Sequence, residues 1–573
     1  MRIPERFIKT IFITAVICFL FVANKAGAVN FRDTMDFNVD KNFDASARTQ
    51  ITATLIKTTP KLYFYIEKNW WDSQVSTKQN EVLANLDSLS VEFESKIYPK
   101  LTSVFGAEWK PGVDGDERIT ILFEAMSANE GGYFREADEY IKLQLPDSNE
   151  REMLYLSLDR FDNSQLKVIL AHEFVHLITF NQKEKIFDVQ EETWLNEARA
   201  DYSSTILGYD DKYDGSNLQR RVKDFIENPL DSVVEWNGNK YDYASVSLFT
   251  NYLVDHYSVG ILTDSLKSKY IGIESLNYAL QKNQLEDRFS QIFTNWTIAS
   301  VLNDCSLGYK YCYLSQNLKN FKIAPSINFL PLTGNVSLSV TNVTKNWQPS
   351  WLKFIGGDGN LALDFSSLTG LNFVLPYIVE DSSGSRKIEY LFLGKDQKGE
   401  ISIKNFGKDY KSIIIIPSLQ SKTSDFDGLE LTYPFTYSVV VTGSVPVEDQ
   451  ALIQKLLDQI AYLRAEIAKL IEQKNGGTST DQDYCLQINN NLSLGMQNNN
   501  EVKCLQNFLK LQGQSIYPEG YITGNFGNMT KTAVIKFQEK YASEILIPIG
   551  LSQGTGYVGS ITRQKINQLL NTR

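Results

Sequence analysis

The stretch "AHEFVHLITFN" (Ala171–Asn181) holds two of the three histidines in this 573-residue chain. His172 and His176 are four residues apart, so on a helix both rings lie on one face, one turn apart. Zinc prefers imidazole and carboxylate ligands in a tetrahedral array, and a catalytic zinc site leaves one position for water. The stretch therefore predicts a helix with two ligands of a single catalytic Zn²⁺. Glu173 is the candidate that takes a proton from water and delivers it to a leaving amine.

The alternative is a chance match on an ordinary helix. Because histidine is so scarce here, a random HExxH has odds of roughly one in a thousand. The pattern therefore favours the zinc site.

A third ligand is expected from "TWLNEARADYSS" (Thr193–Ser204). Glu197 follows His176 by 21 residues, and Asp201 lies four residues further on. On a helix these carboxylates share a face, so Glu197 can bind zinc while Asp201 accepts the free N–H of a ligand histidine. The alternative for each carboxylate is a solvated helix face. A histidine extension of the motif is absent, because Thr179 and Gln182 stand where it would continue.

The length and the net charge of the chain limit the classes of protein to which it can belong. At about 100–200 residues per domain, the length predicts three to five units. The net charge of −11 argues against nucleic-acid binding, which needs a basic face.

Residues 1–28 have the pattern of a signal peptide. Arg2, Arg6 and Lys9 precede an apolar run, and "AGA" (Ala26–Ala28) offers a cleavage site. The alternative, an uncleaved anchor, is disfavoured because the run is shorter than the roughly 20 residues that a spanning helix needs. We therefore expect a secreted chain, extracellular or associated with the cell wall, with no membrane contact after cleavage.

Four cysteines remain after removal of the signal peptide. They fall into two local pairs that predict disulfides in an exported protein, Cys305 with Cys312 and Cys485 with Cys504.

The pattern along the chain predicts a multidomain protein. An N-terminal α/β segment, either part of the catalytic unit or a pro-segment, covers residues 29–105, and an α+β catalytic domain covers 106–325. Short β-prone runs at 330–444 predict a β-sandwich. A heptad pattern at 446–474 predicts a coiled-coil or stalk helix, with weak self-association as one outcome. A linker at 475–483 leads to a small α-helical module at 484–573, in which Gly524, Gly527 and Thr530 recur as Gly556, Gly559 and Thr562.

The motif set resembles the gluzincin zinc metallopeptidases. Successive blocks over residues 105–260 look most like the hyicolysin-type group of secreted bacterial peptidases: "GVDGDERITILF", "GGYFREAD", "SNEREMLYLSL", "LAHEFVHLITFN" and "TWLNEARADY". The resemblance implies a zincin-like domain with zinc ligands His172, His176 and Glu197, and with Glu173 as base and acid. It also implies an edge strand that holds extended substrate, for which "EMLYLSL" (152–158) is our candidate. Val175 and Ala198 replace an expected Gln and Gly.

Peptide hydrolysis also needs a donor for the developing oxyanion. Related gluzincins place a tyrosine on the helix after the glutamate helix, and "KYDYASVSLFTNYLVDHY" (240–257) follows in this chain. Tyr243 is our first candidate, then Tyr241, then His256. The alternative is structural, since most of the 29 tyrosines must belong to the core or the surface.

Residues 485–570 resemble the three-helix peptidoglycan-binding fold of cell-wall enzymes, through "VKCLQNFLKLQG", "GYITGNFGNMTKTAVIKFQEKY" and "GTGYVGSITRQKIN". We therefore expect a secreted zinc endopeptidase that acts on protein or peptide and is tethered to cell-wall peptidoglycan. One alternative is a zinc hydrolase that cuts the peptides of peptidoglycan. The other is a non-catalytic wall-binding scaffold.

Overall fold

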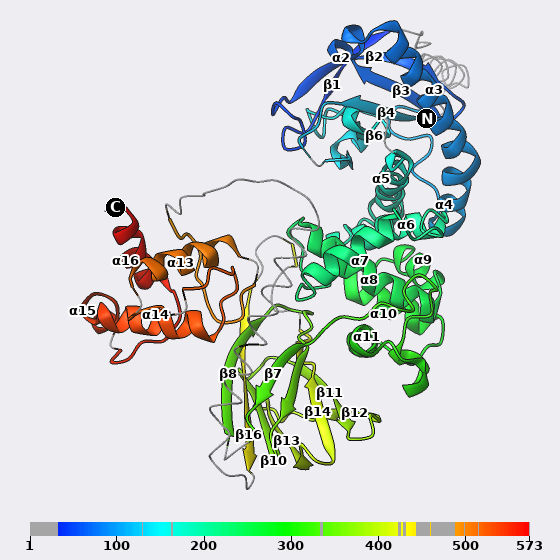
Figure 1. Ribbon diagram of the computed structural model, residues 1–573. Helices are drawn as coiled ribbons and strands as arrows, with labels where there is room; N and C mark the ends of the chain where they lie inside the picture. The colour runs from blue at the N-terminus through cyan, green and yellow to red at the C-terminus, as the bar shows by residue number, and fades with distance from the viewer. Residues whose placement is uncertain are drawn as a thin grey trace, which may run out of the picture. The chain divides into compact units, whose positions relative to one another are not determined.

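The structure is a computed structural model that divides into two compact units, residues 1–447 and 448–573 (Figure 1). It describes residues 33–128, 130–161, 164–332, 336–421, 426–427, 431–442, 459, 487–497, 499–513, 515–518, 520–549 and 551–571. The predicted signal peptide and linker lie outside these residues, as does the predicted coiled-coil helix except for residue 459. Each unit is described by itself.

The first unit begins with a six-stranded sheet in the order β1-β2-β3-β4-β6-β5. Strands β3, β4 and β6 run parallel, and the other neighbours are antiparallel. Three of the strands come from the N-terminal segment, which therefore builds half of this sheet. The strands are β1 (Thr34–Asn38), β2 (Gln50–Thr58), β3 (Leu62–Glu67), β4 (Ile119–Glu124), β5 (Gly132–Phe134) and β6 (Met153–Ser157).

The predicted edge strand is wrong. β6, which contains most of "EMLYLSL", lies between β4 and β5 and has both of its edges paired. The sheet ends at β1 on one side and, on the side of β6, at β5, the short "GYF" strand. Antiparallel pairing of β5 with β6 converts an otherwise exposed parallel strand into an internal one.

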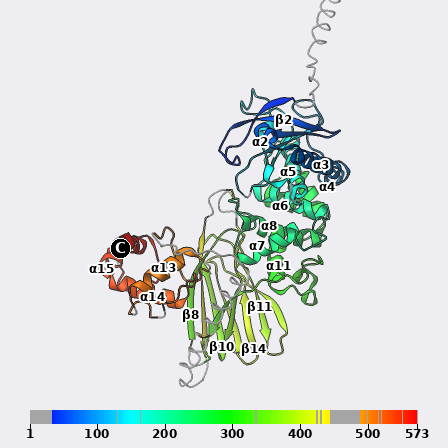
Figure 2. The same ribbon diagram turned by 45° about the horizontal axis from the view of Figure 1, so that its top comes forward.

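Helices pack on one face of this sheet (Figures 1 and 2). The side chains of β3 and β4 alternate between two clusters, so that Phe64 faces the helices and Tyr65 faces a smaller cluster on the opposite face. The buried Val82, Leu86 and Leu89 recur at helical spacing on α3. The first helices are α2 (Lys68–Ser73), α3 (Ser76–Glu92), α4 (Tyr98–Phe105), α5 (Leu166–Phe180) and α6 (Thr193–Ile206).

A helical region follows, with α7 (Asn217–Glu227), α8 (Lys240–Tyr257), α9 (Gly260–Leu266), α10 (Gly272–Lys282) and α11 (Phe289–Leu302). The predicted disulfide between Cys305 and Cys312 is present just after α11. Cys485, of the other predicted pair, lies outside the described residues.

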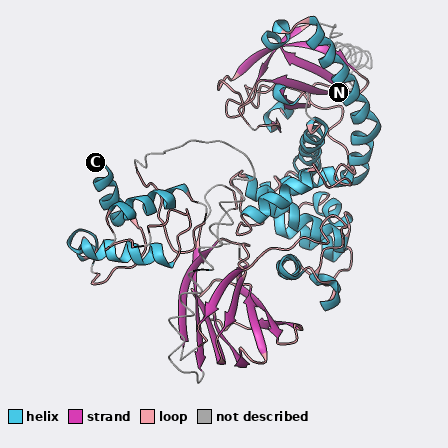
Figure 3. Cartoon of the chain, viewed as in Figure 1, coloured by secondary structure: helices cyan, strands magenta, loops and turns pink. Residues whose placement is uncertain are grey.

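The second sheet has ten strands, and Figure 3 shows it separate from the first. Strands β13, β10, β16 and β8 pair in one group, and β12, β11, β14, β9 and β7 pair in another, with the short β15 paired to β11. A single pairing, Phe406 with Tyr410, joins the groups. Their inward side chains form one apolar cluster, so the strands nearly close on themselves around it. The strands are β7 (Ser326–Leu330), β8 (Val336–Thr344), β9 (Leu352–Gly356), β10 (Gly359–Ser367), β11 (Phe373–Asp381), β12 (Arg386–Leu391), β13 (Lys398–Phe406), β14 (Tyr410–Ile415), β15 (Ser418–Leu419) and β16 (Tyr433–Thr442).

The second unit contains α13 (Asn500–Leu511), α14 (Asn528–Lys540), α15 (Ala542–Ile545) and α16 (Ser560–Asn571) around its own apolar cluster. The predicted repeat has a structural basis in two buried glutamines. Gln506 donates to Thr530 and accepts from the Gly524 amide, and Gln538 makes the same bonds to Thr562 and Gly556. Within the described part of the chain, no helix is both long enough and apolar enough to cross a membrane.

Candidate metal centre

Helices α5 and α6 bring together His172, His176 and Glu197. The Nε2 atom of His172 lies 3.1 Å from Oε2 of Glu197, and the Nε2 atom of His176 lies 3.6 Å from Oε1. One donor atom from each residue falls within 4.8 Å of the others. The two rings stand one turn apart on α5, as the spacing predicts, and their centroids are 4.9 Å apart.

This donor set fits zinc. With zinc–ligand bonds of about 2.1 Å, donor atoms at the corners of a tetrahedron lie about 3.4 Å apart. The distances from the Glu197 carboxylate to the two rings lie on either side of that value. Within the residues that the structure describes, no other group of three histidine, cysteine or acidic side chains meets this criterion.

The helices that carry these residues are held firmly. From Leu170 to Phe180, α5 is buried almost without interruption. Just beyond it, the ammonium of buried Lys183 donates to the carbonyls of Ser265 and Ser268 at 2.9 and 3.0 Å. Glu191, before α6, accepts from the buried guanidinium of Arg199 at 2.8 Å and from the amide of Gly272, at the start of α10, at 2.7 Å. The segments just after α5 and just before α6 are therefore both held to the helical region by hydrogen bonds.

The hydrogen-bond partner of His176, a candidate ligand, differs from the prediction. Nδ1 of His176 lies 3.0 Å from the side-chain oxygen of Asn196. Asp201 instead accepts from Arg221, at 2.9 Å from Nε and 2.7 Å from Nη2, and from Asn217 at 2.9 Å. Among the described residues, no hydrogen bond joins Asp201 to His172 or His176. The sequence could not indicate this, because Arg221 arrives from α7, a separate helix.

The charges in this cluster shift one another's protonation. Burial raises the pKa of Glu173 to about 8, and the negative charge of Glu197 adds to the shift. Burial opposes a charged His172, but the hydrogen bond and charge of Glu197 outweigh it and raise the pKa. Burial lowers the pKa of His176. Burial also works against ionised Glu197, yet the two histidines hold the pKa of this carboxyl below its ordinary value.

A cleft of about 1150 Å³ opens beside the cluster. His172 and Glu173 lie on its wall, with α5 on one side and α7 on the other. Gly131 and Gly132, at the start of the free-edge strand β5, also line it. The same cleft therefore borders both the start of β5 and the candidate metal centre.

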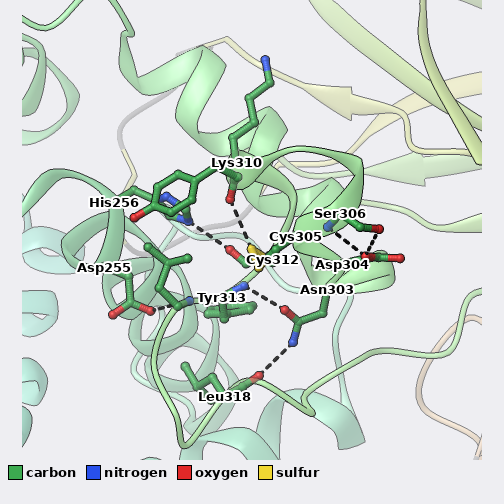
Figure 4. Close-up of a disulfide and its surroundings, with 12 residues drawn as sticks. Asp255, His256, Asn303, Asp304, Cys305, Ser306, Lys310, Cys312, Tyr313 and Leu318 are labelled. Carbon is green, nitrogen blue, oxygen red and sulfur yellow. Dashed lines mark hydrogen bonds between the residues drawn. A yellow bond between two sulfur atoms is a disulfide. The ribbon is translucent and has the colours of Figure 1, made fainter.

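The three oxyanion-donor candidates occupy very different places. Tyr243 lines the cleft, with its ring 6.4 Å from that of His172 and 4.5 Å from the guanidinium of Arg221. Tyr241 donates to Glu227 at 2.8 Å on the exposed start of α8. Figure 4 shows His256 directed at the backbone of the disulfide loop, where its Nε2 lies 3.0 Å from the carbonyl of Cys312. Of the three, only Tyr243 faces the candidate centre.

Comparison with known proteins identifies one part of the chain. Residues 498–544 match a family described as "Putative peptidoglycan binding domain". The chain thus contains a peptidoglycan-binding domain, which confirms the resemblance of the C-terminal module and supports association with the cell wall. A search of curated proteins gives no match to this chain.

Three solved structures show distant likenesses to parts of this chain. The pre-peptidase C-terminal domain of collagenase from Bacillus anthracis is 9% identical, covering 20% of this chain and 96% of its own, with a TM-score of 0.14. The Yersinia pseudotuberculosis-derived mitogen is 10% identical, covering 20% and 92%, with a TM-score of 0.14. The lysozyme inhibitor PliG from Aeromonas hydrophila is 11% identical, covering 21% and 100%, also with a TM-score of 0.14. At these TM-scores the likenesses carry no argument about this chain.

Proposed function

We propose that this chain is a secreted, zinc-dependent endopeptidase of the gluzincin type, with a zincin-like catalytic domain, that acts on protein or peptide at a cell wall. The observation that carries the proposal is the convergence of two imidazoles and a carboxylate within 4.8 Å, beside a glutamate on the wall of a large cleft. His172, His176 and Glu197 would hold the ion. Zinc, when bound, supplies a Lewis acid that polarises the substrate carbonyl and acidifies water.

The remaining steps belong to the side chains. Glu173 takes a proton from water and returns it to the departing amine, as a carboxyl with a raised pKa is suited to do. Tyr243 donates to the oxygen that gains charge. Asn196 fixes the orientation of the His176 ring. The free edge of β5 offers backbone hydrogen bonds to an extended substrate.

The test is hydrolysis of a denatured protein by the full mature chain, before and after chelation and after zinc is restored. The chain that is tested must include the second sheet, because the helical region and this sheet share one apolar cluster, which includes Trp347 and Trp351. We expect cleavage that chelation abolishes and zinc restores. Glu173→Gln should keep its zinc and lose at least a hundredfold in kcat. Cleavage that survives chelation would contradict the proposal.

The peptidoglycan-binding domain favours a second candidate, a zinc hydrolase of wall peptides. Chelator-sensitive release of amines from purified peptidoglycan, with no cleavage of denatured protein, would select it. A chain that binds peptidoglycan but cleaves neither substrate would instead be a wall-binding scaffold, and Glu173→Gln would then change nothing.

A further inference from the structure

Two buried carboxyls, those of Glu139 and Glu152, lie together at one end of the first sheet. Glu139 ends the short helix that follows β5, and Glu152 immediately precedes β6. The other end of β6, at Leu156, pairs with Gly132 on the wall of the cleft. Glu139 is 0% exposed and Glu152 is 2% exposed, and they approach closely enough to share a hydrogen bond when one of them is protonated. This acidic pair is therefore separate from the candidate zinc centre.

Three oxygens of the acidic pair have no hydrogen-bond donor. Oε1 of Glu152 accepts from the amide of Val113 at 2.9 Å. In the described part of the chain, no donor reaches Oε2 of Glu152 or either carboxylate oxygen of Glu139, and neither carboxyl belongs to an ion pair. Buried carboxylates in proteins are normally hydrogen-bonded, paired with a cation or bound to a metal ion. These three oxygens therefore point to a ligand that the side chains around them do not supply.

Ionising both carboxyls is costly in the protein chain alone. Burial raises the pKa of Glu139 well above its usual range, and the negative charge of Glu152 raises it further. Burial also raises the pKa of Glu152, to about 7. A cation between the two carboxyls would offset both the burial and the repulsion of like charges.

Two further acids lie near the acidic pair. Asp138 raises the pKa of Glu139, although its own carboxylate accepts from Arg135 at 2.9 Å. Asp114, exposed in the loop before β4, raises the pKa of both members of the pair, while its own pKa is lowered by the charge of Arg151. The two arginines therefore act on these outer acids rather than between the members of the pair.

One lysine offsets part of the negative charge. Lys185 favours the ionised forms of Glu139 and Glu152. Its ammonium, however, donates to the backbone carbonyl of Glu139 at 3.4 Å and lies 3.7 Å from the centre of the Trp109 ring. Lys185 forms no ion pair with either carboxylate, so it does not take the place of a cation bound between them.

A second pair of buried acids shows how this chain can neutralise such a group by itself. Asp231 and Asp242 interact in the same way, and each keeps one buried oxygen without a donor. There, however, Lys345 pairs with Asp231 at 2.7 Å, and the amides of Asn237 and Asn239 donate to Asp242 at 3.2 and 2.9 Å. Among the described residues, the acidic pair has no ammonium in a comparable position.

The loop before β4 lies directly against the acidic pair. Gly112 has a φ of +83°, and a Cβ at this position would lie 1.8 Å from Oε2 of Glu152, so only glycine lets the backbone come so close. Calcium takes about six to eight oxygen ligands from carboxylates, backbone carbonyls and water. Because only two carboxylates converge, the pair falls outside the three-residue grouping that the candidate zinc centre meets. It suits an ion that completes its shell with carbonyls and water.

We propose that Glu139 and Glu152 bind a calcium ion, with backbone carbonyls and water as its remaining ligands. The ion would join the loop before β4, the helix after β5 and the start of β6. It would thereby fix the segment that follows β5, the strand that borders the cleft. The inference does not depend on the proposed peptidase activity.

The test is calorimetric titration of the full mature chain with calcium chloride, after one equivalent of zinc has been added so that the candidate zinc centre does not compete. The buffer contains about 0.15 M salt to screen exposed acids. We expect one site with a Kd of about 1 mM or tighter. Glu139→Gln and Glu152→Gln should each weaken binding about tenfold or more, because each removes a charged ligand. Glu117→Gln, an exposed carboxylate in the loop before β4, should leave Kd within about twofold.

Thermal unfolding separates calcium binding from a purely structural role of Glu139. Without calcium, Glu139→Gln should unfold at or above the wild-type temperature, because it removes repulsion from a buried pair of like charges. With about 10 mM calcium, the wild type should gain about 2 °C or more in Tm and the variant should gain nothing. If Glu139 served packing alone, the variant would lose the same stability with and without calcium, and this result would overturn the inference.

Terbium, which takes oxygen ligands as calcium does, keeps the inference testable if both glutamine variants fail to fold. Trp109 and the Glu139 carbonyl contact the same Lys185 ammonium, so the indole is close enough to sensitise a terbium ion bound at the acidic pair. Excitation of the wild type should give terbium emission that calcium removes by competition. Trp109→Phe should remove most of that emission while leaving calcium affinity unchanged.

The absence of calcium binding by the folded wild-type chain would overturn the inference and indicate that the acidic pair shares a proton or holds only water. Calcium affinity that stays unchanged in both folded glutamine variants would also overturn it, by placing the ion on exposed acids elsewhere. Terbium emission that is unchanged in Trp109→Phe would do the same. None of these results bears on the proposed peptidase.

Discussion

Asn196 immediately precedes Glu197 on α6, so one turn of helix supplies both a candidate ligand and the contact to another ligand's ring. The 3.0 Å contact between its side-chain oxygen and Nδ1 of His176 makes Nδ1 the protonated nitrogen and leaves Nε2 free to face Glu197. Such contacts fix the tautomer and orientation of a metal-binding histidine.

We predict that Asn196→Ala weakens zinc affinity about 10- to 100-fold, because the His176 ring loses the acceptor that orients it. Competition with a chromophoric chelator measures this directly. Asp201→Asn is the matched control, since it leaves the Asn196 contact in place and should change affinity much less. The assignment of Asn196 would be refuted if Asp201→Asn had the larger effect.

Tyr243 and Tyr241 form a natural comparison on α8. Tyr243→Phe should lower kcat by about 100-fold or more with little change in KM, because it removes a donor that is needed mainly in the transition state. Tyr241→Phe removes only a surface bond to Glu227 and should leave kcat near the wild-type value. Steady-state kinetics of both variants on one peptide measures these kcat values. A similar loss of kcat in both variants would exclude Tyr243 as the donor.

At the residue level, sequence spacing predicted which side chains meet but not all of their partners. His172 and His176 share a helix face by geometry alone, and Glu197 follows at a recognisable distance. Asn196 gives no metal-binding signal, since an Asn beside a Glu is ordinary. Asp201 pairs with Arg221, whose position depends on how α7 packs against α6. The spacing of residues within one helix does not predict how two helices pack.

At the level of elements, β4 ends in a carboxylate whose burial makes the first sheet sensitive to pH. Glu124 is fully buried and accepts from the Tyr133 hydroxyl at 2.7 Å. Burial raises its pKa from 4.5 to about 8. The folded chain therefore binds this proton more tightly than the unfolded chain does. Protonated Glu124 therefore contributes its full share to the free energy of unfolding below pH 4.5, and this contribution is lost as the pH rises through about 8.

We predict that Glu124→Gln keeps the bond to Tyr133 and removes this loss. Relative to wild type, the variant should gain on the order of 4 kcal/mol of unfolding free energy between pH 5 and pH 9. Urea unfolding at the two pH values measures the difference. Glu117→Gln, an exposed carboxylate shortly before β4, is the control. An identical pH dependence in Glu124→Gln and wild type would show that Glu124 is ionised in the folded protein.

The sequence predicted the wrong edge strand because the true edge strand, β5, has no clear strand pattern. Residues 152–158 have the apolar pattern of a strand, and they form one. The sequence "GGYF" is too short and too rich in glycine to reveal a strand by its pattern. Its antiparallel pairing with β6 depends on contacts between segments, so the identity of the free edge became visible only in the folded chain.

At the scale of the whole molecule, the helical region and the second sheet are packed as one body. Trp351 donates to the carbonyl of Thr297 at 2.8 Å, and Lys345 pairs with Asp231 at 2.7 Å. The sequence correctly indicated a β-rich region after residue 330 because strand-forming runs replace helical periodicity there. It could not show that this region shares an apolar cluster with the helices, since the buried tryptophans look like any other core residues.

The peptidoglycan-binding domain belongs to the other unit and has its own core. We predict that a chain ending at Val447 keeps kcat/KM for a soluble peptide within about twofold of the full chain and loses its binding to purified peptidoglycan, because separate cores allow separate folding. Co-sedimentation and peptide kinetics on the same preparation test both parts. Retained sedimentation would place wall binding in the first unit.

The central claim is that His172, His176 and Glu197 form a zinc site, and the most direct measurement is the metal content of the purified full-length chain after incubation with zinc and desalting. Elemental analysis should give close to one zinc per wild-type chain and nearly none for His176→Ala, with both proteins folded by circular dichroism. A folded wild-type chain without zinc, or equal zinc in the His176→Ala variant, would contradict the account.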